Sequence, residues 1–590
     1  MTRSEREINL AVRQDSTPWI LFLTALLLYA VGIFWGLPHA TAPDRLSPWG
    51  SDELAPLGPL AQVYHVVFRG DSTFDPRYPL LPYAIQALFM APYLGWLRIT
   101  GGLGHFSTTF PYGLTDPVRS LAVMTLIARC SSLLLMAAVP ALAWRTAAWL
   151  WDRRAAAFAG VFTLFLYPLS YYARTSNVDA GGLFWTALGL LVFAICLRHG
   201  LTRERAIQIG IVAALAVATK DQNYAIFLPV GIVLVILHVR TVREKARSEA
   251  VGPTGATIDR RAWISSPLIA LATAVVIYTL ATGLLFRPDD FARHLNFILY
   301  HPGGQSGRSY FSTPATLVGY ASLISAYVRH LADAMSWPLL ILGAAGAGYA
   351  GWRSPRVLLL ALPVLAVFIG VIAPVRFVRI RFVLPAAYTL ALFAAAGLSA
   401  LADTRATKRD EKPARPQRIA LALRATLAWL VFVGVAGWTT MRSVDLAQQM
   451  LFDSRNQLGT WLQRNAVAGD HLGYYGSAVK LPPLAAGIIT EQGPYAEAYE
   501  RPEGAGWPEF IVTIPQQQFE AEHEWNLPEE RYAELKSGQW NYDMMFSWQA
   551  PAIGSRRPIN WVNPPIRLFV RRDIIARLRD RQPLLRLDGQ

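Results

Sequence analysis

Long apolar runs separated by short polar segments fill most of the chain before residue 442. A helix needs about 20 apolar residues to cross a hydrocarbon core of roughly 30 Å, and about eleven runs come near that length. The sequence therefore predicts an all-α polytopic membrane domain over residues 18–441. The expected helices lie near residues 19–37, 118–142, 155–172, 181–197, 206–219, 224–238, 264–286, 330–350, 357–373, 382–401 and 419–441.

The residues after 441 follow a different pattern. They are too polar for a membrane segment, and they combine a helical periodicity at residues 444–465 with strand-like runs at residues 471–475, 510–514 and 566–570. This pattern predicts a small α/β domain over residues 442–590.

Arginine and lysine clusters set the expected orientation, because cytoplasmic loops accumulate positive residues. Residues 1–17 are then cytoplasmic, while loops 38–117 and 287–329 and the C-terminal domain are extracytoplasmic. The basic positions that fall together on the cytoplasmic side are Arg3, Arg6, Arg13, Arg145, Arg153, Arg154, Arg198, Arg203, Arg205, Arg240, Arg243, Lys245, Arg247, Arg260, Arg261 and residues 405–418. These basic clusters all fall on the cytoplasmic side if residues 80–97 form an interfacial helix and residues 206–238 form two helices joined by an external turn.

Composition narrows the class further. The chain is 53% hydrophobic and 16% charged, with two cysteines and a net charge of +15. Its basic residues lie between apolar runs, a membrane-topology pattern that gives no reason to expect a nucleic-acid partner. Cys130 and Cys196 lie inside apolar runs and predict no disulfide. The sequence contains no phosphate-binding P-loop, dinucleotide fingerprint or H-E-x-x-H motif, so the usual support for nucleotide-driven pumping and zinc protease chemistry is missing.

Acidic residues recur on the predicted external face. Asp52 and Glu53 lie early in the first external loop, before an apolar stretch at residues 54–68 that is typical of an interfacial segment. Asp179 follows Asn177 in a short external turn, just before a predicted helix. Two interpretations stay open for each site. Asp52 and Glu53 are either merely solvated or placed to meet a lipid-linked substrate. Asp179 is either a helix cap or a second reactive carboxylate.

Cationic residues also recur there. Lys220, Arg376 and Arg379 occupy external turns, where positive charge is disfavoured, and Arg174 is a weaker candidate. These side chains either reach the lipid headgroups or bind a phosphate, which the planar guanidinium fork suits. Lone histidines such as His65 are more often structural, and the ligands of any metal stay unknown.

This arrangement resembles the GT-C glycosyltransferases, specifically the bacterial relatives of protein O-mannosyltransferases and aminoarabinose transferases. The features that carry the resemblance are Asp52-Glu53, residues 77–83 (RYPLLPY), the turn Asn177-Val178-Asp179, Thr219-Lys220, and residues 379–385 (RIRFVLP). It covers residues 19–401, and the C-terminal domain is similar to one that many relatives append. One departure is Gly50-Ser51, where relatives often carry His-Pro or an aromatic residue before the acids, which puts the acceptor type in doubt.

The resemblance implies an inverting transfer of a sugar from a polyprenyl phosphate to a hydroxyl acceptor at the extracytoplasmic face of a bacterial inner membrane. The acceptor is a glycan, a lipid or a protein. Asp52 would be the general base, Glu53 a supporting acid, and Asp179 a second acid that positions the acceptor or a metal. Lys220, Arg376 and Arg379 would bind the phosphate, with Arg174 as a further candidate. The family is mixed in its use of a divalent metal, so no cofactor is certain.

The main rival is a transporter or flippase of lipid-linked saccharides, which would use the same cations to pass phosphate. Transporters place ionisable residues near mid-membrane, whereas the acids here fall at one face. A glycan ligase and a purely structural protein are more distant alternatives. The transferase hypothesis requires Asp52, Asp179 and the basic residues to gather in one cavity.

Overall fold

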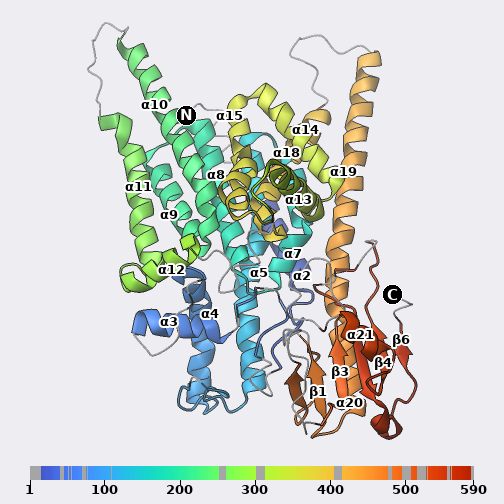
Figure 1. Ribbon diagram of the computed structural model, residues 1–590. Helices are drawn as coiled ribbons and strands as arrows, with labels where there is room; N and C mark the ends of the chain where they lie inside the picture. The colour runs from blue at the N-terminus through green and yellow to red at the C-terminus, as the bar shows by residue number, and fades with distance from the viewer. Residues whose placement is uncertain are drawn as a thin grey trace. The chain divides into compact units, whose positions relative to one another are not determined.

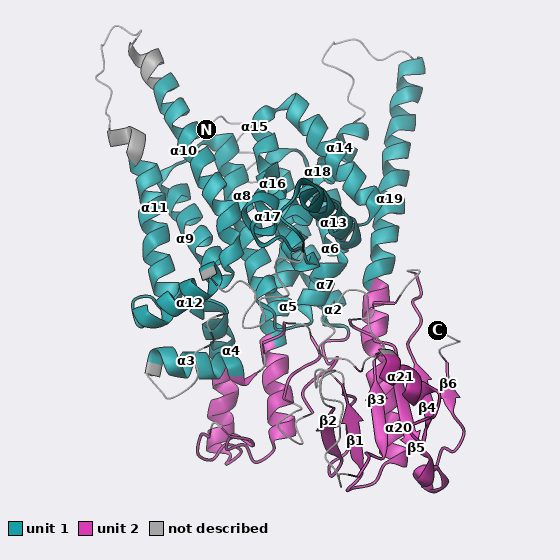
Figure 2. Ribbon diagram, viewed as in Figure 1, with its two compact units in different colours: residues 1–31, 58–89, 129–443 teal, residues 32–57, 90–128, 444–590 magenta. Residues whose placement is uncertain are grey.

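A computed structural model describes most of the chain, as two compact units. Unit 1 comprises Met1–Val31, Gly58–Phe89 and Arg129–Ser443, and unit 2 comprises Gly32–Leu57, Met90–Ala128 and Val444–Gln590 (Figure 2). The described residues are 15–39, 46–50, 52–54, 56–68, 75, 77–107, 109–250, 261–300, 313–403, 415–475, 481–493, 506–514, 527, 529–554, 558–559 and 561–586. Arg3, Arg6, Arg13, Arg260 and residues 405–414, all used above for orientation, lie outside them.

Helices make up nearly all of unit 1 (Figure 1). The helices of the chain up to Leu451 are α2 (Thr17–Ala30), α3 (Leu57–Phe68), α4 (Leu80–Ile99), α5 (Pro117–Leu150), α6 (Arg153–Leu164), α7 (Tyr167–Ala173), α8 (Val178–His199), α9 (Arg203–Thr219), η2 (Asp221–Asn223), α10 (Tyr224–Ala250), α11 (Arg261–Ala281), α12 (Pro288–Tyr300), α13 (Leu317–Met335), α14 (Trp337–Arg353), α15 (Pro355–Leu358), η4 (Leu359–Ala361), α16 (Leu362–Val367), η5 (Phe368–Ile372), α17 (Ala373–Val375), η6 (Ile380–Val383), α18 (Leu384–Leu401) and α19 (Arg415–Leu451).

Within the described part of the chain, seven helices are long and apolar enough to cross a membrane, or up to nine if each bent pair is one span. Large apolar side chains are exposed on these and on shorter apolar helices, including Leu228 and Leu430 on the former and Leu27 and Leu271 on the latter. Exposed apolar surface on this scale requires an apolar surrounding. The protein is therefore a multi-pass membrane protein, as its hydropathy pattern predicts. Residues 80–97, expected to be interfacial, form helix α4, which also meets the length and hydropathy criteria for a span.

Several predicted helix bounds are wrong. The helix expected at residues 330–350 is two helices, α13 and α14, bent by 107° at Ser336. Ser336 has a positive φ of 73°, and the proline at the start of α14 suits a new helix rather than a continuing one. The helix expected at 19–37 ends at Ala30, before turns at Gly32 and Gly36 with positive φ. The expected external loop 287–329 already contains α12 and the beginning of α13.

Small residues bring the helices of unit 1 into close contact. Gly346 of α14 lies so near α18 that a Cβ there would be 1.9 Å from the carbonyl oxygen of Phe393. Gly210 of α9 approaches α11 similarly, since its Cβ would be 2.5 Å from the carbonyl oxygen of Ala270. Such contacts are characteristic of membrane helices, which associate by close packing.

Unit 2 contains the C-terminal α/β domain. The strands are β1 (His471–Tyr474), β2 (Ile489–Gln492), β3 (Phe510–Thr513), β4 (Tyr542–Trp548), β5 (Ile566–Arg571) and β6 (Leu584–Leu585), with α20 (Ser454–Asn465), α21 (Glu529–Lys536) and η9 (Arg572–Arg577). They form one mixed sheet in the order β2-β1-β3-β5-β4-β6, in which β1 runs parallel to β2 and β3, and β5 antiparallel to β3 and β4.

The predicted strands of this domain are confirmed as β1, β3 and β5, whereas β2, β4 and β6 were not predicted. Side chains from α20 and the sheet form its core, among them Leu458, Leu472, Phe510 and Leu568. The helix expected at residues 444–465 is interrupted: α19 continues to Leu451, and α20 begins after Asp453, whose carboxylate caps it.

Candidate functional site

Asp179 and Lys220 form a buried ion pair in unit 1. Asp179 lies in the first turn of α8, where the Asn177 side chain caps the helix and accepts a hydrogen bond from the Asp179 amide at 3.1 Å. Lys220 follows the last residue of α9 in an extended conformation, and its ammonium group contacts one carboxylate oxygen of Asp179. Among the described residues, the other oxygen, Oδ2, is buried without a hydrogen-bond partner. The capping role expected for this turn therefore belongs to Asn177.

Glycines allow this pair to form. A Cβ at Gly181 of α8 would lie 2.9 Å from the Thr219 side chain, and one at Gly182 would lie 3.3 Å from the amide nitrogen of Asn223. The turn that carries Lys220 can therefore pack directly on the first turn of α8.

A basic segment, residues 376–382, lies beside Lys220. The Lys220 ammonium lies 5.5 Å from the centre of the Phe382 ring, and the Arg381 guanidinium lies 5.6 Å from the centre of the same ring. Arg379 stands 5.2 Å from the ring of Phe377, which in turn lies 6.3 Å from that of Phe382. Cation–π contacts of this kind hold positive side chains close to one another.

Arg376 gives this segment its turn. It adopts a left-handed conformation with φ of 48°, after the end of α17, and its carbonyl oxygen accepts a hydrogen bond from the Thr313 amide at 3.3 Å. The structure therefore brings Asp179, Lys220 and the segment that carries Arg376 and Arg379 to one region of unit 1.

Arg174 has a different environment from the other candidate cations. It is 1% exposed, and its guanidinium donates to the carbonyl oxygens of Leu28, Val31 and Ser170 and to the Ser170 hydroxyl. These bonds join α2 to α7 and occupy most of its N–H groups. They favour a structural role for Arg174 over the phosphate-binding role expected from the sequence.

Asp52 and Glu53 belong to unit 2. Asp52 lies in a turn with φ of 55°, a left-handed conformation that aspartate and asparagine adopt more readily than most residues. The turn is closed by a hydrogen bond from the Glu53 amide to the Gly50 carbonyl oxygen at 3.2 Å. Their approach to Asp179, which lies in unit 1, stays a prediction.

Sequence reasoning missed two carboxylate–histidine pairs in unit 1. His294 Nε2 lies 3.2 Å from Asp221, the residue after Lys220, and His65 Nε2 lies 3.1 Å from Asp290. Asp290 also pairs with Arg287 at 3.4 Å. The available signal was the spacing of Asp290 and His294, which places both on one face of helix α12.

Helix α12 exposes both polar and apolar side chains, since Arg293 and Asn296 are exposed as well as two leucines. Its buried face carries Asp290 and His294, while Leu295 and Leu299 are 38% and 66% exposed. A short helix that exposes leucines beside charged and polar residues is typical of a membrane interface.

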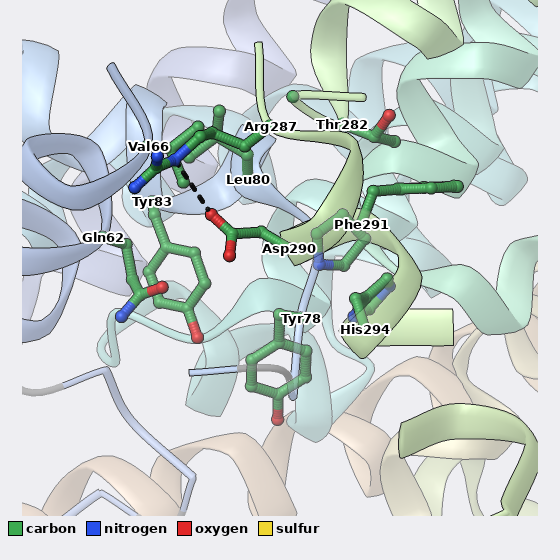
Figure 3. Close-up of a pocket in the computed structure, with 12 residues that line it drawn as sticks. Gln62, Val66, Tyr78, Leu80, Tyr83, Thr282, Arg287, Asp290, Phe291 and His294 are labelled. Atoms are coloured by element: carbon green, nitrogen blue, oxygen red, sulfur yellow. Dashed lines mark ion pairs between the residues drawn. The ribbon is translucent and has the colours of Figure 1, made fainter. Parts of the chain in front are cut away.

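A pocket lies between α3, α4, the end of α11 and α12. Gln62, Tyr78, Tyr83 and Arg287 line it together with the inner face of α12. Figure 3 shows the Asp290 carboxylate facing the Arg287 guanidinium, with the two tyrosine rings beside them. Aromatic rings and convergent polar groups in one concavity are typical of ligand-binding sites.

Asp75 contacts two of the residues that line this pocket, Gln62 and Tyr83. Asp75 accepts hydrogen bonds from the Arg77 guanidinium, the shortest at 2.7 Å, and from the Tyr83 hydroxyl at 3.1 Å. Its amide donates to Gln62 at 3.1 Å. Burial alone would raise the pKa of Asp75, but the bonds and charge of Arg77 outweigh it and leave the pKa below its ordinary value. Asp75 therefore stays ionised at neutral pH, and its carboxylate is held in place by Arg77 and Tyr83.

No group of three or more histidine, cysteine, aspartate or glutamate side chains within the described ranges is arranged to hold a metal ion.

The chain matches no protein-family model and no curated protein. Among solved structures it is similar to the Archaeoglobus fulgidus oligosaccharyltransferase in complex with zinc and sulfate, with 14% identity and a TM-score of 0.40. That match covers 79% of this chain and 62% of the archaeal one, so this chain spans less than two thirds of that protein's length.

The chain is also similar to ArnT from Cupriavidus metallidurans, in the apo state and bound to undecaprenyl phosphate. The identities are 14% and 13% and the TM-scores 0.44 and 0.40, and both matches cover 94% of this chain and 98% of ArnT.

Proposed function

We propose that the chain is an inverting glycosyltransferase that moves a sugar from a polyprenyl phosphate to a hydroxyl acceptor. The observation that carries the proposal is the buried Asp179–Lys220 pair beside the basic segment 376–382. A membrane protein that gathers a lysine and several arginines at one place is suited to bind an anion, and a lipid phosphate is the anion most available there.

The chemistry needs one base and a set of cations. The acceptor oxygen attacks the anomeric carbon as Asp52 takes the hydroxyl proton, with Glu53 in support, and the bond from that carbon to the phosphate oxygen breaks. The electron pair leaves with the phosphate, whose charge Lys220, Arg376 and Arg379 stabilise. Phosphate is a good leaving group, so no general acid is required. A single displacement of this kind inverts the anomeric carbon.

The second carboxylate has a positioning role in this scheme. Asp179 holds the Lys220 ammonium in place through one oxygen, and Oδ2 would be the atom that contacts the acceptor or a divalent metal. His294 lines the pocket between α3, α4 and α12, and it contacts Asp221, the residue after Lys220. Its polar lining suits the hydroxyl groups of a sugar.

The orientation follows from the distribution of positive residues. The N-terminus is cytoplasmic, the C-terminal domain is extracytoplasmic, and transfer takes place at the outer face of a bacterial inner membrane. The partners are a polyprenyl-phosphate sugar, membrane lipids and an acceptor that is a glycan, a lipid or a protein.

Transfer by the purified full-length protein in lipid nanodiscs tests the proposal. The donor is a radiolabelled polyprenyl-phosphate sugar, and the readouts are label in an envelope acceptor fraction and release of polyprenyl phosphate. Asp52→Asn keeps a residue that tolerates the left-handed turn but removes the base, so we expect kcat to fall by roughly 10²–10⁴. Arg531→Gln, on the exposed surface of α21, is the control and should transfer normally.

Two outcomes would contradict the proposal. Normal transfer by Asp52→Asn ends the assignment of the base. Movement of intact lipid-linked sugar across a proteoliposome membrane, with no release of polyprenyl phosphate, identifies a transporter instead.

A further inference from the structure

A buried cluster of unit 2 joins the Asp52 turn to the C-terminal domain. It consists of Trp35, Trp49, Asp453 and Arg455, each at most 3% exposed. The Arg455 guanidinium lies 3.9 Å from the centre of the Trp49 ring and 5.6 Å from that of Trp35. Arg455 also donates to both oxygens of Asp453, at 3.0 and 2.7 Å, and the Trp35 indole N–H donates to Asp453 at 2.8 Å.

The charged half of this cluster is fixed to the domain. Asp453 caps α20 by accepting a hydrogen bond from the Arg455 amide at 2.8 Å. Arg455 donates to the Val562 carbonyl oxygen at 2.9 Å, and Ser454 bonds to Asn563 and Pro564. The ion pair is therefore held by a segment that leads directly into strand β5.

The aromatic half is fixed to the Asp52 turn. The Trp49 amide donates to the Gly36 carbonyl oxygen at 2.9 Å, and a Cβ on Gly36 would lie only 2.4 Å from the Trp49 Cβ. Trp49 is thus locked against the backbone just before the turn that Gly50 and Glu53 close. Asp52 is three positions from a side chain that stacks on Arg455.

Stability alone gives a weak reason for this arrangement. A buried ion pair costs desolvation, and apolar side chains of similar volume often stabilise a protein as well or better. A bidentate, planar arginine stacked on an indole does, however, fix the position of its partners more narrowly than apolar packing does.

We infer that Arg455 is a positioning residue for the Asp52 carboxylate, so that the C-terminal domain completes the catalytic turn. The inference rests on the proposed function in assigning a reaction to Asp52. It requires that loss of the planar fork loosen the turn and lower kcat without weakening donor binding, since Arg455 is not among the proposed phosphate ligands.

Arg455→Lys in the full-length protein tests this, because lysine keeps the charge but has neither the fork nor the flat face. A misplacement of about 1 Å can cost on the order of 10²-fold in rate. We expect kcat to fall roughly 10- to 100-fold with donor KM unchanged, and no further fall when Arg455→Lys is added to Asp52→Asn. Arg577→Lys, at the Asp470 ion pair of the same domain, is the matched control and should leave kcat unchanged.

Amide hydrogen exchange of residues 46–54 gives a readout that does not depend on activity. The Trp49 and Glu53 amides are both hydrogen-bonded, so we expect Arg455→Lys to speed their exchange while Arg577→Lys does not. If Arg455→Lys does not fold, Trp49→Phe weakens the same stack and leaves the domain's ion pair intact. Unchanged exchange and unchanged kcat overturn the inference. Faster exchange in Arg455→Lys, together with a wild-type protein that transfers no sugar, supports the anchoring of the turn and refutes the proposed function instead.

Discussion

Substitution of Lys220 by methionine separates the structural and the functional roles of the Asp179–Lys220 pair. The Lys220 side chain is 12% exposed and that of Asp179 is 2% exposed, so the pair is shielded from water. Removing the ammonium group leaves the Asp179 carboxylate buried and uncompensated, which costs about 3–5 kcal/mol. Asp179→Asn costs less, because the Lys220 ammonium retains the Phe382 ring and partial contact with solvent.

The double variant Asp179→Asn/Lys220→Met removes both charges, so most of the stability should return. Thermal unfolding of each variant in the same nanodisc, followed by tryptophan fluorescence, measures this order. We expect Tm to fall most for Lys220→Met, less for Asp179→Asn and least for the double variant. A coupling energy of at least about 1 kcal/mol, within the range for contacting residues, should result.

Donor binding should not return with stability. If Lys220 binds the phosphate, the double variant still lacks one charge-assisted hydrogen bond, worth about 1.5–3 kcal/mol, so its donor KM should be roughly 10- to 100-fold higher than that of the wild type. A double variant with wild-type stability and wild-type KM would show that the pair is only structural. A Lys220→Met protein as stable as the wild type would refute the reasoning about burial itself.

Three further outcomes follow from packing and charge. Arg174→Gln leaves buried carbonyl oxygens of α2 without donors and should cost about 1–3 kcal/mol in unfolding free energy, measured by denaturant titration. Gly346→Ala places a methyl group against α18 and should cost about 1–3 kcal/mol, whereas Gly348→Ala on the same helix meets no described heavy atom within 4 Å and should gain about 0.5–1 kcal/mol. Burial raises the pKa of Asp75, but Arg77 lowers it further, so Asp75 contributes stability above the unfolded value of 3.8 that is lost as pH falls through its lower folded pKa. A Tm series below pH 5 should therefore fall more steeply for the wild type than for Asp75→Asn.

Hydropathy predicted a helical membrane protein because it reports which segments avoid water, but seven to nine of the described helices, and not eleven, meet the criteria for a span. It does not report the direction of a helix, and apolar residues lie on both sides of Ser336, so it did not predict the 107° bend between α13 and α14. In the C-terminal domain, the missed strand β4 has a register shift between Met544 and Phe546 that interrupts the alternation of side chains, and β2 is largely polar.

The candidate site was predicted only as far as charge and order along the chain allow. Lys220 and the arginines of residues 376–382 stand out because positive residues are rare in external turns. The partners of His294 and His65 are 73 and 225 residues away in sequence, and only the tertiary fold shows them. Arg174 shows the converse, since its charge was evident but the carbonyl oxygens that it contacts were not.

Helix α12 carries two exposed leucines on the same short segment that lines the pocket with Asp290 and His294. We expect these leucines, Leu295 and Leu299, to contact lipid, because apolar side chains of interfacial helices insert there. Hydrophilic replacements at these two positions, a common way to improve solubility, would detach the helix from the bilayer and loosen the wall of the pocket behind it. We therefore expect the detergent used for purification to affect the shape of this pocket.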